Sequence, residues 1–149
     1  MKNESTPPHE GIYKIGFYLD RILFSLIKIL NRELKEENCD IRQPEFSIMQ
    51  TLSVRGSMSQ SSLAKILGKE RSGISRSVKL LESKGYIKRD PLNGSTNQVD
   101  LTEAGKLAIP GFIEMYNRVV DGAFKGLSEK SRQSIMKNLD KIYQNIEEE

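Results

Sequence analysis

The segment 59–85 constrains the fold of this chain more than any other, because it predicts two short helices joined by a tight turn. Its sequence is SQSSLAKILGKERSGISRSVKLLESKG. In the first predicted helix the apolar side chains share one face, and the turn begins at Gly68. The second helix carries Ile74, Val78 and Leu81 at the i, i+4 and i+7 spacing of a buried stripe. Two helices joined so closely predict a helix-turn-helix motif.

The opposite face of the second predicted helix carries hydroxyl groups and cations. These residues are Arg71, Ser72, Ser75, Arg76 and Lys79. Hydroxyl and guanidinium groups can bind base edges in a DNA major groove, and cations can bind phosphates. The same pattern would also suit an amphipathic helix whose polar face is only solvated, so periodicity alone leaves both interpretations open.

The local charge favours the DNA-binding interpretation. Between Lys65 and Arg89 there are eight Lys or Arg residues against two acidic residues, Glu70 and Glu82, although the whole chain carries only +3. A local excess of positive charge beside a helix-turn-helix pattern is typical of proteins that bind duplex nucleic acid.

A β-hairpin is predicted directly after the second helix. Residues 86–89 and 98–101 have strand character, and Asn93-Gly94 between them is a strong hairpin signal. A hairpin in this place forms the wing of a winged helix, and Lys88 and Arg89 put positive charge at its base. A hairpin with a structural role alone is the alternative.

Helical spacing of apolar residues predicts further helices on both sides of this region. The chain is expected to be mainly α, an α+β winged helix of six helices and a two-stranded wing. The predicted helices outside the motif cover 11–37, 43–56, 102–127 and 129–146. Pro110 is expected to bend or break the third of these. The first would span about 40 Å, which is longer than a compact lobe needs, so it is expected to reach a partner chain.

Composition narrows the function classes. With 149 residues and 37% apolar content, the chain can bury one core. One Cys and one His provide too few ligands for the common zinc and iron-sulfur sites, and no disulfide framework is possible. We therefore expect no metal, no cofactor, no enzyme activity and a cytoplasmic location without a membrane partner. Residues 1–10 are predicted to be a disordered tail.

The order of these elements resembles the MarR family of bacterial transcription regulators from about Ile12 to Ile146. The matching segments are QPEF at 43–46, SQSSLAKILG at 59–68, Ser75-Arg76 followed by LESKGYI at 81–87, and LTEAG at 101–105. The second of these is similar to the family pattern TQ-x-x-LA-x-x-LG, and the last is similar to LT-x-x-G. Together the segments are specific, although each alone is weak.

The resemblance implies a single domain over 11–149. In it, 11–37 and 102–149 would form a dimerisation lobe from the terminal helices, and 43–101 would form the winged helix-turn-helix lobe. It also implies a homodimer that binds double-stranded DNA at a palindromic operator, acting as a repressor. In many members a small-molecule effector binds between the dimerisation helices and the winged lobes, and the residues that would bind it here are not indicated by the sequence.

Two departures from the family pattern concern DNA contacts. The wing tip has Asn93, Gly94 and Ser95 where relatives commonly carry acidic and basic residues, and the usual wing arginine corresponds to Ser95. Lys79 stands where relatives often have an acidic residue. An arginine gains from the negative potential of a narrow minor groove, so we expect weaker groove contact from this wing. A winged-helix module that binds protein rather than DNA is the alternative function.

Overall fold

The computed structural model describes residues 11, 13–39, 41–90 and 98–147 and confirms the six predicted helices and the strands of the wing. The elements are α1 (Tyr13–Glu36), α2 (Gln43–Arg55), β1 (Met58–Ser59), α3 (Gln60–Leu67), α4 (Arg71–Ser83), β2 (Ile87–Asp90), β3 (Gln98–Leu101), α5 (Glu103–Ala123) and α6 (Glu129–Glu147). Within the described parts of the chain, no helix has the length and apolarity needed to cross a membrane. The predicted tail 1–10 and the wing tip lie outside the described residues.

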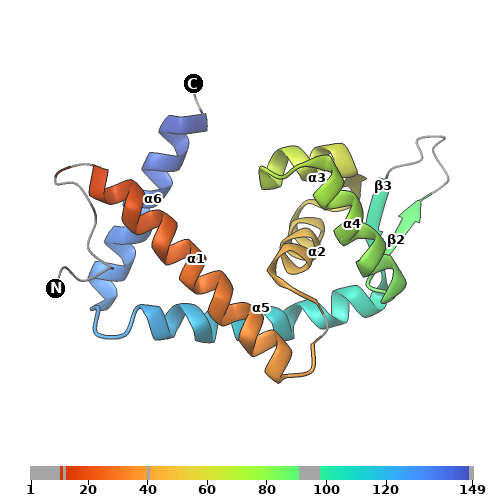
Figure 1. Cartoon of the computed structure of the whole chain (residues 1–149), viewed down its shortest axis with the longest axis horizontal. Helices are drawn as coiled ribbons and strands as arrows, with labels where there is room; N and C mark the ends of the chain where they lie inside the picture. The colour runs from red at the N-terminus through yellow and green to blue at the C-terminus, as the bar shows by residue number, and fades with distance from the viewer. Residues whose placement is uncertain (1–10, 12, 40, 91–97, 148–149) are drawn as a thin grey trace, which may run out of the picture.

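The elements gather into two groups that share α5. Figure 1 shows α2, α3, α4 and the sheet together at one end, whereas α1 and α6 extend at the other end and α5 runs along both. The core lies where α2 packs on α4 and α5. Phe46 of α2 contacts Phe112 of α5 edge to face, with ring centroids 5.8 Å apart. Leu63 of α3 and Val78 of α4 are fully buried in the same cluster.

Capping hydrogen bonds fix the starts of α3 and α5. Ser59 accepts a hydrogen bond from the backbone N–H of Ser62 at 3.1 Å, and Thr102 accepts one from Gly105 at 3.0 Å. Each bond satisfies a backbone donor that the first turn of a helix leaves free. Gly85, with φ of +75°, ends α4 in the left-handed region that glycine tolerates. Glu70 precedes α4 without a side-chain capping bond.

The sheet has one strand more than predicted. β2 and β3 form the expected antiparallel hairpin, and β1 pairs with the other edge of β3, giving the order β1-β3-β2. In β1, Met58 lies opposite Val99 and Ser59 opposite Gln98. A strand of two residues is too short to show the alternation that marks strands in a sequence.

The helix does not break at Pro110, because α5 continues from Glu103 to Ala123 through it, and a bend at the proline stays a prediction. Ile109 and Phe112, on either side of the proline, are both buried. Burying such side chains contributes about 1.5 to 3 kcal/mol each. That gain can offset the roughly 3 kcal/mol that an interior proline costs a helix.

The terminal helices leave apolar side chains uncovered. α6 has no buried residue among those described. Its exposed apolar residues are Met136, Leu139, Ile142, Tyr143 and Ile146. α1 buries Leu30 and Leu34 near its end, whereas its first half exposes Ile15, Tyr18, Leu19, Ile22, Leu23 and Phe24. The start of α6 is held by Arg132, which pairs with Asp121 of α5 at 3.1 Å.

Candidate nucleic-acid interface

Helix α4, the second helix of the helix-turn-helix, is amphipathic in the way the sequence predicts. Ile74, Val78 and Leu81 are buried, with exposed fractions of 3% or less. On the other side, Arg71, Ser72, Arg76 and Lys79 are exposed, and Ser75 is half-buried. The structure therefore brings the five predicted recognition residues to one surface of the molecule.

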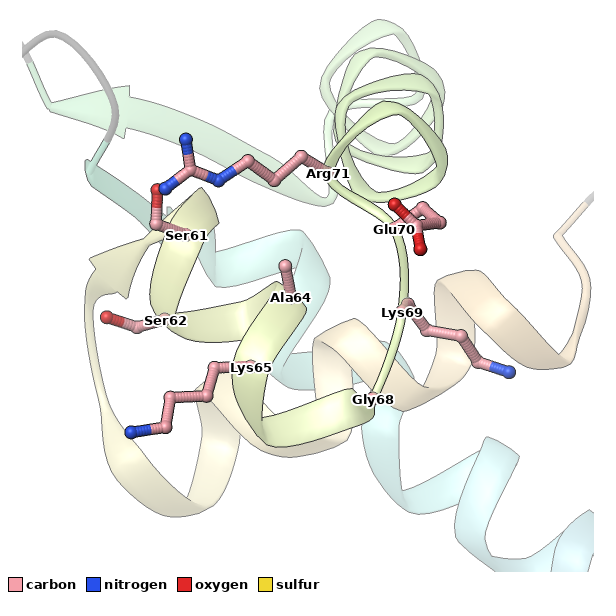
Figure 2. Close-up of a pocket in the computed structure, with 8 residues that line it drawn as sticks. All are labelled: Ser61, Ser62, Ala64, Lys65, Gly68, Lys69, Glu70 and Arg71. Carbon is pink, nitrogen blue, oxygen red and sulfur yellow. The ribbon is translucent and has the colours of Figure 1, made fainter.

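A hollow of about 580 Å³ lies beside the start of α4, where the turn of the motif meets α3. We call it the α3–α4 hollow; it is lined by Ser61, Ser62, Ala64, Lys65, Gly68, Lys69, Glu70 and Arg71. In Figure 2 the guanidinium group of Arg71 reaches from α4 toward Ser61 of α3, while Lys65 and Ser62 point outward. Lys69 and Glu70 point to the other side of the turn.

The residues of α3 in this hollow were missed by the sequence analysis. Ser61, Ser62 and Lys65 are exposed and lie on the face of α3 that is opposite the buried Leu63 and Ala64. Their spacing of i, i+1 and i+4 places them on one helical face, which could have been seen in the sequence. Hydroxyl and ammonium groups around a concave surface are suited to binding phosphate oxygens.

The cations at the base of the wing have acidic neighbours within the protein. Arg89 Nε lies 3.0 Å from Glu82 Oε2 of α4, and both side chains are partly exposed. The pKa of the Glu103 carboxyl is lowered, mainly by a hydrogen bond from Lys106 and to a smaller extent by the charge of Lys88. Part of the positive charge at the wing base is thus already paired within the protein. The predicted tip residues Asn93, Gly94 and Ser95 lie outside the described residues.

A second, larger cleft of about 790 Å³ separates α1 from the helix-turn-helix. We call it the α1 cleft. Its apolar wall is formed by Leu23, Ile27, Ile48, Ile66, Leu67, Ile74 and Leu80. Its polar lining includes Glu45 of α2 and the α4 residues Arg76 and Ser77. No sequence motif marks this cleft, because its walls combine residues of four different helices, α1 to α4.

A helix-turn-helix with a wing and an exposed cationic recognition helix defines this chain as a winged helix-turn-helix DNA-binding protein. The MarR family model matches residues 41–99, which span α2, the helix-turn-helix and the wing. Over this segment the chain is similar to the MarR family, whose members are transcription regulators and not enzymes. The match supports DNA binding and transcription regulation for this chain.

Individual relatives and solved structures are similar to the chain over most of its length. The HTH-type transcriptional repressor IacR of Pseudomonas putida is 25% identical over 133 residues, covering 88% of this chain and 78% of the relative. A MarR transcriptional regulator from Methanosarcina mazei Go1 has a TM-score of 0.83 at 19% identity and covers 93% of this chain and 92% of its own. A MarR family transcriptional regulator from Silicibacter pomeroyi DSS has a TM-score of 0.78 at 22% identity and covers 94% of this chain and 97% of its own.

Proposed function

We propose that this protein is a cytoplasmic repressor that binds a palindromic operator as a homodimer and is released by a small-molecule effector. The observation that carries the proposal is the continuous surface of cations and hydroxyl groups formed by the exposed face of α4 and the α3–α4 hollow. A relative that matches most of the chain is named a transcriptional repressor, which supports the direction of regulation.

We assign recognition of the DNA base sequence to α4. Arg76 is exposed near the middle of the helix and would bind guanine O6 and N7, the commonest specific contact of arginine in a major groove. Ser72 and Ser75, one turn and one residue before it, would assist at neighbouring base edges. Lys79, one turn later, would bind a phosphate.

Phosphate binding is assigned to the α3–α4 hollow. Ser61 and Ser62 offer hydroxyl donors, and Lys65 and Arg71 offer positive charge around the same concave surface. The start of α4 adds backbone N–H groups and the positive end of a helix dipole. One DNA strand held here would fix the position of α4 in the adjacent major groove.

The wing would make weaker contacts. Lys88 and Arg89 would anchor its base on phosphates, while Asn93, Gly94 and Ser95 would add backbone and hydroxyl contacts. Because Arg89 already pairs with Glu82 at 3.0 Å, a phosphate has to compete with that carboxylate.

Dimerisation is assigned to the terminal helices. The apolar side chains exposed on α6 and on the first half of α1 are not covered by the described residues of one chain. Burial against the same helices of a second copy would form an isologous interface with two-fold symmetry. The two recognition helices would then bind half-sites about one turn of DNA apart, which is why the operator is expected to be palindromic.

The effector is assigned to the α1 cleft. This cleft lies between a dimerisation helix and the DNA-binding lobe, and its lining includes Arg76. A molecule bound there would contact both groups of helices, so its binding can be coupled to the spacing and orientation of α4.

Arg76→Ala tests the DNA-reading assignment. A preferred duplex is first selected from random DNA with the purified protein, and affinity is then measured by fluorescence anisotropy at fixed salt. The substitution should cost about 1 to 3 kcal/mol on the selected duplex and much less on random duplex, because only the former loses a base contact. Lys125→Ala, an exposed lysine between α5 and α6, is the matched control and should change neither affinity.

Lys65→Ala provides the contrasting variant, since loss of a phosphate contact should weaken both duplexes equally. Equal losses on both duplexes for Arg76→Ala would show that Arg76 is only a phosphate contact. If the unmodified protein selects no DNA at all, the protein-binding winged-helix module becomes the better interpretation.

A further inference from the structure

Glu45 is a buried carboxylate at the start of α2, with an exposed fraction of 7%. One of its oxygens, Oε2, accepts a hydrogen bond from the backbone N–H of Arg42 at 3.0 Å. The other, Oε1, accepts a hydrogen bond from the hydroxyl of Ser77 in α4 at 2.5 Å. This last bond joins α2 to the recognition helix through the interior of the protein.

The charge of Glu45 is not balanced by a cation within the described parts of the chain, where no ion pair involves it. An ionised carboxylate can accept about four hydrogen bonds, and Glu45 accepts two from the described residues. A buried carboxylate with unused acceptor capacity and no countercharge can gain strongly from a cationic donor.

Both residues of this hydrogen bond line the α1 cleft. Glu45 and Ser77 form part of its wall together with apolar side chains such as Leu23, Ile48 and Leu80. A ligand in this cleft would therefore meet an apolar surface and one buried negative charge.

We propose that the α1 cleft binds a small organic cation, an amine with an apolar body, whose ammonium group pairs with Glu45. The inference rests on the proposed function, because it names the chemical class of the effector assigned to this cleft. The apolar body would lie against Leu23, Ile48 and Leu80, and the ammonium would donate hydrogen bonds to the carboxylate.

A ligand with an acidic head group fits the cleft less well. The cations that line it, Lys69 and Arg76, are exposed, so their attraction for an anion is weakened by water and by salt. Glu70 lies beside Lys69 and offsets its charge. Glu45, by contrast, is buried and would repel an anion where electrostatic interactions are strongest.

Binding of the amine would act on DNA recognition through Ser77. An ammonium that donates to Oε1 shares this oxygen with the Ser77 hydroxyl and draws its negative charge away, which weakens the hydrogen bond between Ser77 in α4 and Glu45 in α2. Ser77 follows Arg76 directly in α4, so loss of this bond frees the part of the helix that reads DNA. The amine should therefore weaken binding to the selected duplex.

Isothermal titration calorimetry with phenethylamine tests the inference, and 3-phenylpropionate serves as a matched probe of opposite charge. The full chain should bind phenethylamine and bind 3-phenylpropionate much more weakly. Glu45→Gln retains the size of the side chain and an acceptor for Arg42, and should lower phenethylamine affinity roughly tenfold to a hundredfold. Ser77→Ala removes the competing hydroxyl and should raise that affinity. Thermal unfolding followed by circular dichroism checks that both variants are folded.

Glu70→Gln separates the buried carboxylate from the one at the rim of the cleft, and should change phenethylamine affinity less than twofold. An equal loss in Glu70→Gln and Glu45→Gln, or tighter binding of 3-phenylpropionate than of phenethylamine, would overturn the inference. DNA affinity without ligand is measured on the same samples. If the protein binds DNA but not phenethylamine, only this inference is overturned. If it does not bind DNA, the proposed function is overturned, and calorimetry still shows which class of ligand the cleft binds.

Discussion

Replacing Gly105 by alanine should destabilise the protein, because a side chain there has no room beside the wing. Gly105 lies in the first turn of α5, and a Cβ atom built on it would be 2.0 Å from the carbonyl oxygen of Tyr86 and 3.1 Å from Leu101 Cδ2. Real Cβ atoms essentially never approach closer than 3.0 Å, so the backbone at Tyr86 or at Gly105 must shift by about 1 Å. That carbonyl also accepts a hydrogen bond from Thr102 N at 3.0 Å.

The expected loss follows from these contacts. Overpacking costs about 1 to 3 kcal/mol, and weakening of one backbone hydrogen bond adds about 1 kcal/mol. Alanine gains up to about 1 kcal/mol over glycine inside a helix, so Gly105→Ala should lower the free energy of unfolding by about 1 to 3 kcal/mol. Urea unfolding followed by circular dichroism at one fixed protein concentration measures this, since the stability of the proposed dimer would depend on concentration.

Gly111→Ala is the matched control in the same helix. Gly111 is exposed, and a Cβ atom built on it has no neighbour within 4 Å. The substitution should therefore raise the free energy of unfolding by about 0.5 to 1 kcal/mol, which is the helix preference of alanine alone. If Gly105→Ala is as stable as the unmodified protein, α5 does not approach the backbone of Tyr86 as closely as described.

Two further predictions concern assembly and the wing. Light scattering at micromolar concentration should give a mass of about 34 kDa, twice that of the 16.9 kDa chain. Ile142→Asp should shift this mass toward that of the monomer, because it puts a charge on the exposed apolar face of α6. A monomeric unmodified protein would refute the proposed interface. Glu82→Gln should tighten binding to all duplexes by roughly twofold to fivefold, since it frees Arg89 for phosphate, and Arg89→Ala in the same chain should abolish the gain. No gain in anisotropy experiments would show that the wing base does not approach DNA.

The sequence predicted the features that depend on local patterns. Ile74, Val78 and Leu81 follow the helical period that predicts a buried stripe, and all three are buried. The glycine of LTEAG also has a physical reason, since Gly105 lies against the backbone of Tyr86. The resemblance to the MarR family was confirmed along with the fold.

Features that depend on contacts between distant segments could not be predicted. The bond between Glu45 and Ser77 joins residues 32 positions apart, and the ion pair between Arg89 and Glu82 joins a strand to a helix. The continuity of α5 through Pro110 depends on the burial of Ile109 and Phe112, which only the packed structure shows. The roles of the individual DNA-contacting residues remain predictions.

The short strand β1 connects the strands of the wing rigidly to the helix-turn-helix. Ser59 pairs with Gln98 at the edge of the sheet, and its side chain also caps α3. Ser59 thus ends β1, which pairs with β3, and directly precedes α3. The strand β3 and the helix α3 therefore cannot rotate independently of each other. The conformational entropy of aligning the wing with the helix-turn-helix is lost during folding and not at the encounter with DNA. Association should consequently be a single kinetic step at each half-site, without a slower phase in which the wing docks.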